Sequence, residues 1–148
     1  LQMEYMNIYA SCNYSKGKKN SDQHCGEAKH DSKIDTNFLE KISCHIHFKY
    51  NTIGEILPSC PFQTIKDCEI NHSKLTSLHQ EALKTIKVLN LNQASLVLLR
   101  KKEQTELFKI LNRFSKEQVN AQIQKLNNLD TFPRFIDMLL YYMKQKKR

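Results

Sequence analysis

The sequence predicts a mostly α protein, a small helical bundle of four or five helices with a disordered N-terminal segment. The 148 residues include only three glycines and three prolines, too few for the many tight turns of a β-sandwich or a doubly wound sheet. In the second half, apolar residues recur at steps of three and four, the spacing of an amphipathic helix. We therefore divide the chain into a flexible low-complexity segment, 1–35, and a helical domain, 36–148.

The N-terminal segment turns polar after a few apolar residues at its start. Residues 15–22 read SKGKKNSD, without one aliphatic or aromatic side chain. Such a stretch buries too little apolar surface to offset the conformational entropy lost on ordering. We expect a linker or a tail here.

The first helix is expected to begin at Asp35 or Thr36, either of which can cap it, and to run to about Leu57. An apolar stripe supports this helix: Phe38, Leu39, Ile42, Ile46, Ile53, Ile56 and Leu57. Pro58 would end it. A strand over residues 42–50 is the competing interpretation, because apolar and other side chains alternate strictly there. The helix is the preferred prediction.

Two further helices are predicted in the middle of the chain. Ser73 can cap the first, whose apolar stripe consists of Leu75, Leu78, Ala82, Leu83, Ile86 and Leu89. Residues 90–92 read NLN, a break. The next helix carries the stripe Leu96, Leu99, Glu103, Leu107, Ile110, Leu111 and Phe114. Its polar centre, residues 100–106, is expected to project from the core.

The last two helices have clear start signals. Ser115 and Gln118 fit a capping box, with Phe114 placed to contact Val119. After a restart at residues 130–133, which read DTFP, the final helix is apolar on most of its circumference. We expect a helix of this kind to lie centrally in the bundle.

Charge is unevenly distributed along the chain. Residues 1–73 contain eight lysines and nine acidic residues, whereas residues 74–148 contain fifteen basic and six acidic residues. A basic helical half suits nucleic acid or an acidic protein surface. The expected contacts to such a partner are Arg100, Lys101, Lys102, Lys144, Lys146, Lys147 and Arg148.

Five cysteines, an odd number at irregular spacing, all lie in the first half and indicate reduced thiols in an intracellular protein. A structural zinc site stays open for Cys44, Cys60, Cys68 and His72, although only the spacing from Cys68 to His72 resembles a zinc hook. No metal or cofactor is expected on balance.

Signatures of catalysis are missing from the sequence. It has no glycine-rich phosphate loop and no nucleophile elbow, and we therefore expect no enzyme and no small-molecule substrate. No apolar run reaches the length of a membrane span, and no membrane association is expected.

A non-enzymatic helical protein-interaction module of a larger intracellular protein, with the nucleus favoured, is the function that these patterns predict. Phe132, Tyr141 and Tyr142 are the expected aromatic contacts to a protein partner. One alternative is a basic helical nucleic-acid-binding segment. Another is a secreted four-helix cytokine-like protein, which fits the helix count better than the cysteine distribution.

A cysteine-, asparagine- and lysine-rich lead precedes helices such as the one in residues 92–102, which read NQASLVLLRKK. Over residues 36–148 this texture resembles pieces of the very large vertebrate germ-cell proteins of the testis-expressed fifteen family. The resemblance implies work in meiotic chromosome repair and transposon silencing through protein contacts, in or beside the nucleus. It assigns no functional residue, because no motif is shared.

Overall fold

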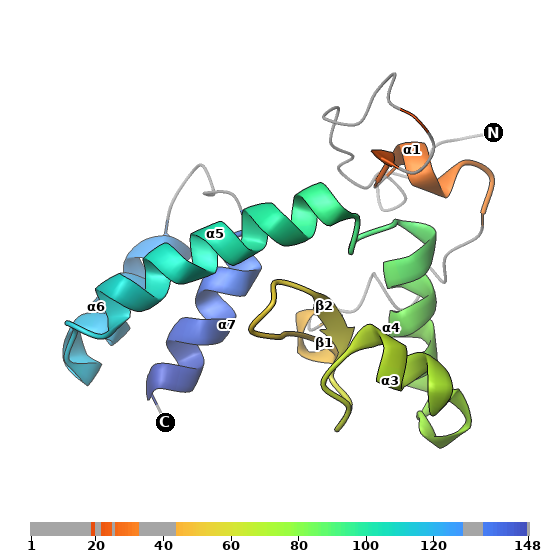
Figure 1. Cartoon of the computed structure of the whole chain (residues 1–148). Helices are drawn as coiled ribbons and strands as arrows, with labels where there is room; N and C mark the ends of the chain where they lie inside the picture. Colours follow the sequence, from red (N-terminus) through yellow and green to blue (C-terminus); the bar gives the residue numbers. More distant parts are fainter. Residues whose placement is uncertain (1–18, 20–21, 25, 33–43, 129–134, 148) are drawn as a thin grey trace, which may run out of the picture.

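The computed structural model describes residues 19, 22–24, 26–32, 44–128 and 135–147, and over these residues the chain is mostly helical (Figure 1). Two structural units follow each other along the chain. We call residues 44–93 the hairpin unit and residues 94–147 the three-helix unit. The long helix α5 begins beside α4 of the hairpin unit and extends across to α6 and α7.

The hairpin unit opens with a short antiparallel ribbon. A 3₁₀ turn, η4 (Cys44–His47), leads into β1 (Phe48–Tyr50), which pairs with β2 (Ile56–Pro58) in the register Phe48 to Pro58 and Tyr50 to Ile56. The predicted helix from residue 36 to 57 is therefore wrong from residue 44 onward, and the strand alternative holds over β1. Residues 36–43 lie outside the described part of the chain.

The turn between the strands explains why the helix fails. The Asn51 Oδ1 atom accepts hydrogen bonds from the backbone N–H groups of Ile53, at 3.2 Å, and Glu55, at 2.9 Å. An asparagine side chain that bonds to the following backbone favours a turn over a helix. Gly54 completes the reversal at a φ of +91°, in the left-handed region that favours glycine.

Two helices cover the ribbon. The short helix α3 (Ile65–Ile70), capped by Thr64, was not predicted, and the 3₁₀ turn η5 (His72–Lys74) links it to α4 (Ser77–Val88). Thr76, not Ser73, caps α4, because Ser73 lies within η5 and the chain becomes extended only at Leu75. The predicted break after α4 is confirmed, with Asn90 at a φ of +46°.

The three-helix unit follows the predicted pattern closely. It comprises α5 (Ala94–Leu111), α6 (Lys116–Asn127) and α7 (Ile136–Lys147), and α7 packs against both α5 and α6. The capping box between Ser115 and Gln118 is present with both of its hydrogen bonds. The hydrophobic core of the three-helix unit contains Leu107, Leu111, Val119, Met138, Tyr142 and Met143.

The two units have separate hydrophobic clusters. In the hairpin unit the cluster consists of Leu57, Cys60, Cys68, Leu75 and Leu83, and it joins β2 to α3 and α4. The polar centre of α5 lies between the two clusters. It projects into solvent on one side only: Lys101 and Lys102 are exposed, whereas Arg100 is 4% exposed and Gln104 is 2% exposed, because both of these side chains reach carbonyl groups of the hairpin unit.

Within the segment predicted to be flexible, residues 26–29 form the short helix α1 (Gly26–Lys29), and the Asn90 side chain donates a 2.6 Å hydrogen bond to the Gln23 carbonyl. Among the residues that the structure describes, no helix combines the length and the apolar character that crossing a bilayer requires.

Candidate protein-docking surface

The tip of the hairpin is fastened to the three-helix unit through its backbone carbonyls. The Asn51 carbonyl accepts hydrogen bonds from the Tyr142 hydroxyl, at 2.8 Å, and from the Gln104 amide, at 3.2 Å. The Lys101 ammonium group donates to the next carbonyl, that of Thr52. Side chains of α5 and α7 thus hold the main chain of the turn.

Arg100 is the second residue that connects the hairpin to the three-helix unit. Its guanidinium donates to the Gly54 carbonyl at 2.7 Å, to the Leu91 carbonyl, and to the Asn92 Oδ1 atom at 3.4 Å. It also lies 5.8 Å from the centre of the Phe135 ring, within range of a cation–π contact. One buried cation therefore connects the turn, the α4–α5 loop and the start of α7.

Close backbone contact accompanies these bonds. A Cβ atom at Gly54 would lie 2.5 Å from the Val97 carbonyl oxygen of α5 and 3.0 Å from the Lys101 nitrogen. No larger residue fits there without displacing the turn from α5. The turn is held in one place on the three-helix unit, and any site between them has fixed walls.

A hollow of about 390 Å³ lies at this junction. We call it the tyrosine pocket. Its wall combines the hairpin tip, the loop that leads into α3, and one face of α7, through Tyr50, Asn51, Thr52, Ile53, Gln63, Thr64, Tyr141, Tyr142 and Gln145.

Aromatic rings dominate one side of the pocket. Tyr141 lies edge-on between Tyr50 and Tyr142, with ring centres 5.7 Å and 5.1 Å away. Phe108 of α5 extends the series, 5.1 Å from Tyr142. Such edge-to-face pairs stabilise one another, and they hold the rings in fixed orientations before any ligand arrives.

The buried tyrosine hydroxyls stay protonated far above neutral pH. Burial and, to a smaller degree, the Asp137 carboxylate raise the pKa of Tyr50 to about 12, against an opposing effect of Arg100. Burial, with a smaller effect of Tyr141, likewise raises the pKa of Tyr142. Neither hydroxyl is suited to accept a proton near pH 7, and the pocket therefore offers neutral rings and hydrogen-bonding groups.

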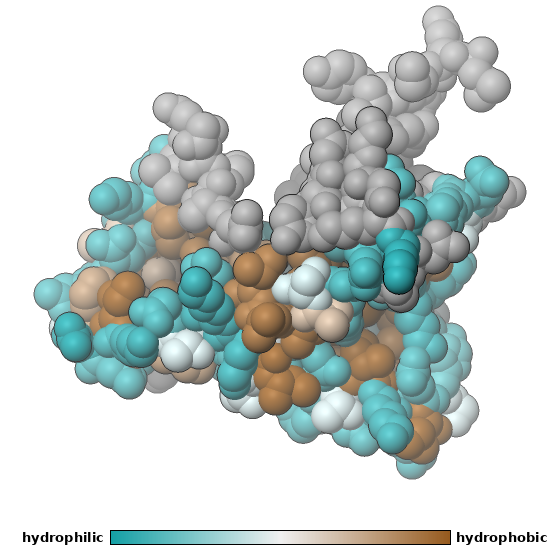
Figure 2. All heavy atoms as spheres, turned by 45° about the horizontal axis from the view of Figure 1, so that its top comes forward, coloured by the Kyte–Doolittle hydropathy of each residue, from teal (hydrophilic) through white to brown (hydrophobic). Residues whose placement is uncertain are grey.

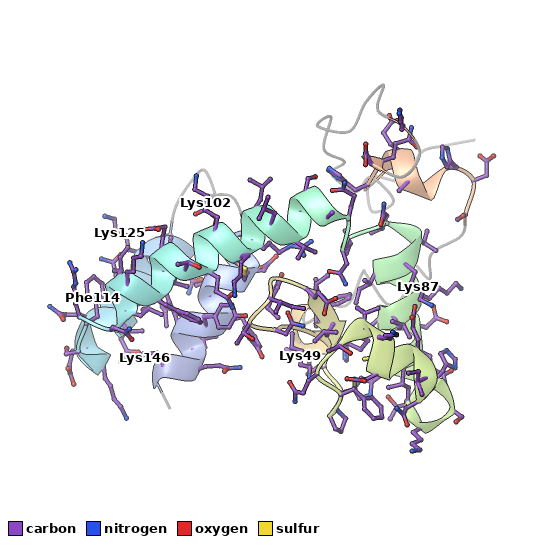
Figure 3. All side chains as sticks on the ribbon, in the orientation of Figure 1. Lys49, Lys87, Lys102, Phe114, Lys125 and Lys146 are labelled. Atoms are coloured by element: carbon purple, nitrogen blue, oxygen red, sulfur yellow. The ribbon has the colours of Figure 1, made fainter. Side chains whose placement is uncertain are left out.

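The three-helix unit, which supplies one wall of the pocket, is rich in positive charge. Residues 94–147 contain eleven basic and five acidic residues, and Lys144 and Lys146, both exposed, flank Gln145 on α7. Helix spacing places them one turn beyond Tyr141 and Tyr142. Figure 3 labels Lys102, Lys125 and Lys146 on three different helices of this unit. Lys144 and Lys146 are therefore the exposed basic residues of α7 that are next in the chain to a residue of the pocket wall.

The predicted contact residues have different fates. Lys101, Lys102, Lys144 and Lys146 are exposed, as a contact role requires. Arg100 is a correction, since its guanidinium is buried and bonded to carbonyl groups, out of reach of a phosphate or carboxylate partner. The side chain of Lys147 and the whole of Arg148 lie outside the described part of the chain.

The predicted aromatic contacts divide in the same way. Tyr141 is half-buried in the pocket wall. Tyr142 is 8% exposed and serves mainly as core and as a donor to Asn51, a correction to its expected role as a surface anchor. Phe132 lies outside the described residues. Sequence reasoning missed Tyr50, for which the strand pattern at 42–50 was the available signal, and Ile53, which lies beyond that pattern.

Of the candidate zinc ligands, Cys60, Cys68 and His72 have described side chains, and these three do not form a metal site. Within the described residues, no group of at least three histidine, cysteine or acidic side chains is placed to hold a metal ion. The Sγ atoms of Cys60 and Cys68 are 3.4 Å apart, whereas His72 is exposed in η5. These two cysteines form a buried thiol pair.

Exposed aliphatic side chains outside the pocket are scattered over different elements. Ile46 in η4, Ile70 at the end of α3 and Leu98 on α5 are 55%, 74% and 70% exposed. Figure 2 shows apolar side chains near the middle of one face and mostly hydrophilic ones toward both of its ends. Isolated apolar residues are ordinary on protein surfaces, and the pocket is the better-defined feature.

Compared with family models, curated proteins and solved structures, the chain matches none of them.

Proposed function

We propose that this chain is a non-enzymatic protein-interaction module whose tyrosine pocket receives an apolar or aromatic side chain from an extended acidic segment of a partner. The observation that carries this proposal is the pocket itself, an aromatic-walled hollow at the fixed junction of the two units. Tyrosine is enriched in protein interfaces because it supplies a large, rigid contact area together with a polar group.

The remaining pocket residues suit an extended peptide. Gln63 and Gln145 offer side-chain amides, which can donate to and accept from a peptide backbone. Ile53 is 52% exposed in the pocket wall and has apolar area left to bury. One buried side chain with backbone hydrogen bonds to each side is a common form of peptide recognition.

The positive charge of the three-helix unit favours a partner segment that is acidic. The excess of six positive charges over residues 94–147 attracts a negatively charged segment and accelerates its encounter with the pocket. The proposal places this module inside the cell, with the nucleus favoured. The resemblance to the testis-expressed fifteen family adds germ-cell chromosome repair and transposon silencing as its setting.

Selection from a library of random linear peptides on the purified chain tests the proposal. The expected peptides combine aspartate or glutamate with one aromatic or aliphatic residue. Their affinity should fall about 10-fold in the double variant Lys144→Glu and Lys146→Glu. The matched control is Lys66→Glu with Lys74→Glu, which makes the same charge change at exposed sites of the hairpin unit and should leave the affinity nearly unchanged.

A parallel binding experiment tests the alternative that the chain binds nucleic acid. Single-stranded and duplex oligonucleotides are titrated against the chain at low and at physiological salt. Recovery of no peptide, together with oligonucleotide binding that weakens steeply with salt, would replace the proposal by the nucleic-acid alternative. Equal peptide affinity in both double variants would show that Lys144 and Lys146 do not contribute to peptide binding.

A further inference from the structure

Cys60 and Cys68 form a buried pair in the hairpin unit. Their Sγ atoms are 3.4 Å apart, and the side chains are 4% and 0% exposed within the cluster that also contains Leu57 and Leu83. A disulfide bond is about 2.05 Å long, and the two sulfur atoms need to approach by little more than 1 Å to form one.

Local structure fixes both residues. Cys60 follows β2 in a tight turn, in which its N–H group donates to the Pro58 carbonyl at 2.8 Å and its own carbonyl accepts from Lys49 at 2.6 Å. Cys68 is the buried residue of α3, whose start is set by the Thr64 cap. The thiols therefore meet because of the fold on each side of them.

We propose that Cys60 and Cys68 are a redox pair that closes to an intramolecular disulfide by exchange with a small-molecule disulfide of the glutathione type. This site is independent of the proposed docking function. Its ligand class is a low-molecular-weight disulfide, and reduced glutathione reverses the reaction.

The exchange proceeds in two balanced steps. The thiolate of Cys60, the less deeply buried of the two, attacks one sulfur of oxidised glutathione, and one glutathione thiolate leaves. The Cys68 thiolate then attacks the Cys60 sulfur of the mixed disulfide and releases the second glutathione thiolate. The two cysteine protons end on the two released thiols. Two cysteine thiols are oxidised and one glutathione disulfide is reduced.

The environment makes this exchange slow. Burial, assisted by the hydrogen bond with Cys60, raises the pKa of Cys68 to about 12. Oxidised glutathione also needs the turn to open before it can reach Cys60. The pair is thus protected from rapid oxidation, while its alignment favours the disulfide at equilibrium.

The bond would close a ring that includes two residues of the tyrosine pocket. Gln63 and Thr64 lie between the cysteines, and the Gln63 carbonyl accepts a 3.1 Å hydrogen bond from the Asn51 side chain. Oxidation restricts this wall of the pocket. An effect on peptide affinity rests on the proposed function, whereas formation of the disulfide does not.

Redox titration of the full chain tests the proposal. Cys12, Cys25 and Cys44 are replaced by serine to leave the pair alone, and the variant is equilibrated with reduced and oxidised glutathione in native buffer and in concentrated urea. Mass spectrometry separates the intramolecular disulfide, which has lost two hydrogen atoms, from glutathione adducts. Peptide mapping of the oxidised wild-type chain provides a second readout that does not depend on the substitutions.

The expected equilibrium constant for the disulfide is roughly 10- to 100-fold larger in native buffer than in urea, with a rise in Tm of roughly 10 °C on oxidation. The two results are linked, because a fold that stabilises the disulfide is stabilised by it to the same degree. Equal constants in the two solvents, glutathione adducts as the main native product, or a wild-type map that pairs other cysteines would each overturn the proposal.

Discussion

The hairpin unit and the three-helix unit are stabilised by different means. The three-helix unit packs long side chains from helices that are close in sequence. The hairpin unit contains a smaller cluster with two cysteines, and its ribbon depends on distant side chains of α5 and α7 for hydrogen bonds. The candidate site lies where the turn of one unit meets the helices of the other.

Charge separates the units as well. Residues 44–93 contain five basic and four acidic residues, and Lys87 and Lys84 pair there with Glu69 and Glu81. The three-helix unit contains the large excess of positive charge. At the pocket, the hairpin unit supplies Tyr50 and the walls of the turn and of the loop before α3, whereas the three-helix unit supplies Tyr141, Tyr142 and most of the positive charge.

The largest predicted effect tests the core of the three-helix unit. Met138 is 0% exposed, and Met138→Asp buries a carboxylate without a partner. We expect the free energy of unfolding to fall by more than about 4 kcal/mol, enough to unfold the unit. Far-UV circular dichroism during thermal melting measures this. Lys144→Asp, on the exposed side of α7, is the control and should cost less than about 1 kcal/mol.

The second prediction concerns the hydrogen bonds of Arg100 that connect the two units. Arg100→Leu leaves the carbonyls of Gly54 and Leu91 without this donor, and we expect a loss of about 3 kcal/mol of stability. Lys102→Leu changes an exposed neighbour on the same helix and should alter stability by less than about 0.5 kcal/mol. Equal denaturant midpoints for the two variants would contradict the burial and the bonding of Arg100.

A smaller effect is expected at the turn. Gly54→Ala places a Cβ atom against the Val97 carbonyl at a positive φ, and we expect a loss of roughly 2–3 kcal/mol with displacement of the hairpin tip. Backbone chemical shifts of Asn51 and Thr52 report the displacement. Thr52→Ala, an exposed substitution in the same turn, is the control. A stable Gly54→Ala protein with unshifted resonances would show that the turn does not contact α5 closely.

The smallest effect concerns alkaline pH. The pKa of Tyr50 is about 12 in the folded chain against an ordinary value of 10.0. Between these pH values the unfolded chain loses the proton and the folded chain keeps it, and stability falls as the pH rises. Thermal melts from pH 9 to pH 12 should show a shallower decline in Tyr50→Phe than in the wild-type chain. An unchanged slope would mean that Tyr50 is not buried.

Local signals explain what the sequence could predict. Periodic apolar residues indicated α4 to α7, and Ser115 with Gln118 marked the start of α6, because helices are set by neighbours a few positions away. The hairpin was harder. Its residues fit both a helical stripe and a strand alternation. Asn51 and Gly54, together with hydrogen bonds to α5 and α7, stabilise the hairpin and not the helix.

The candidate site was predicted only in part. Tyr141 and the exposed lysines were identified, because aromatic residues and charge on a terminal helix are visible in the sequence. The burial of Arg100 was not predicted, because its hydrogen-bond acceptors include backbone carbonyls up to 46 positions away in the sequence. The pocket wall from Ile53 and Gln63 depends on the same long-range contacts, for which composition and periodicity give no signal.

The most direct test compares two exposed isoleucines in the peptide-binding assay. Ile53 lies in the pocket wall and Ile70 lies outside it, and they are 52% and 74% exposed. We predict that Ile53→Ala weakens binding of the selected peptides about 10-fold, while Ile70→Ala leaves the Kd unchanged and neither variant alters Tm appreciably. Equal affinities for the two variants would contradict docking at the tyrosine pocket.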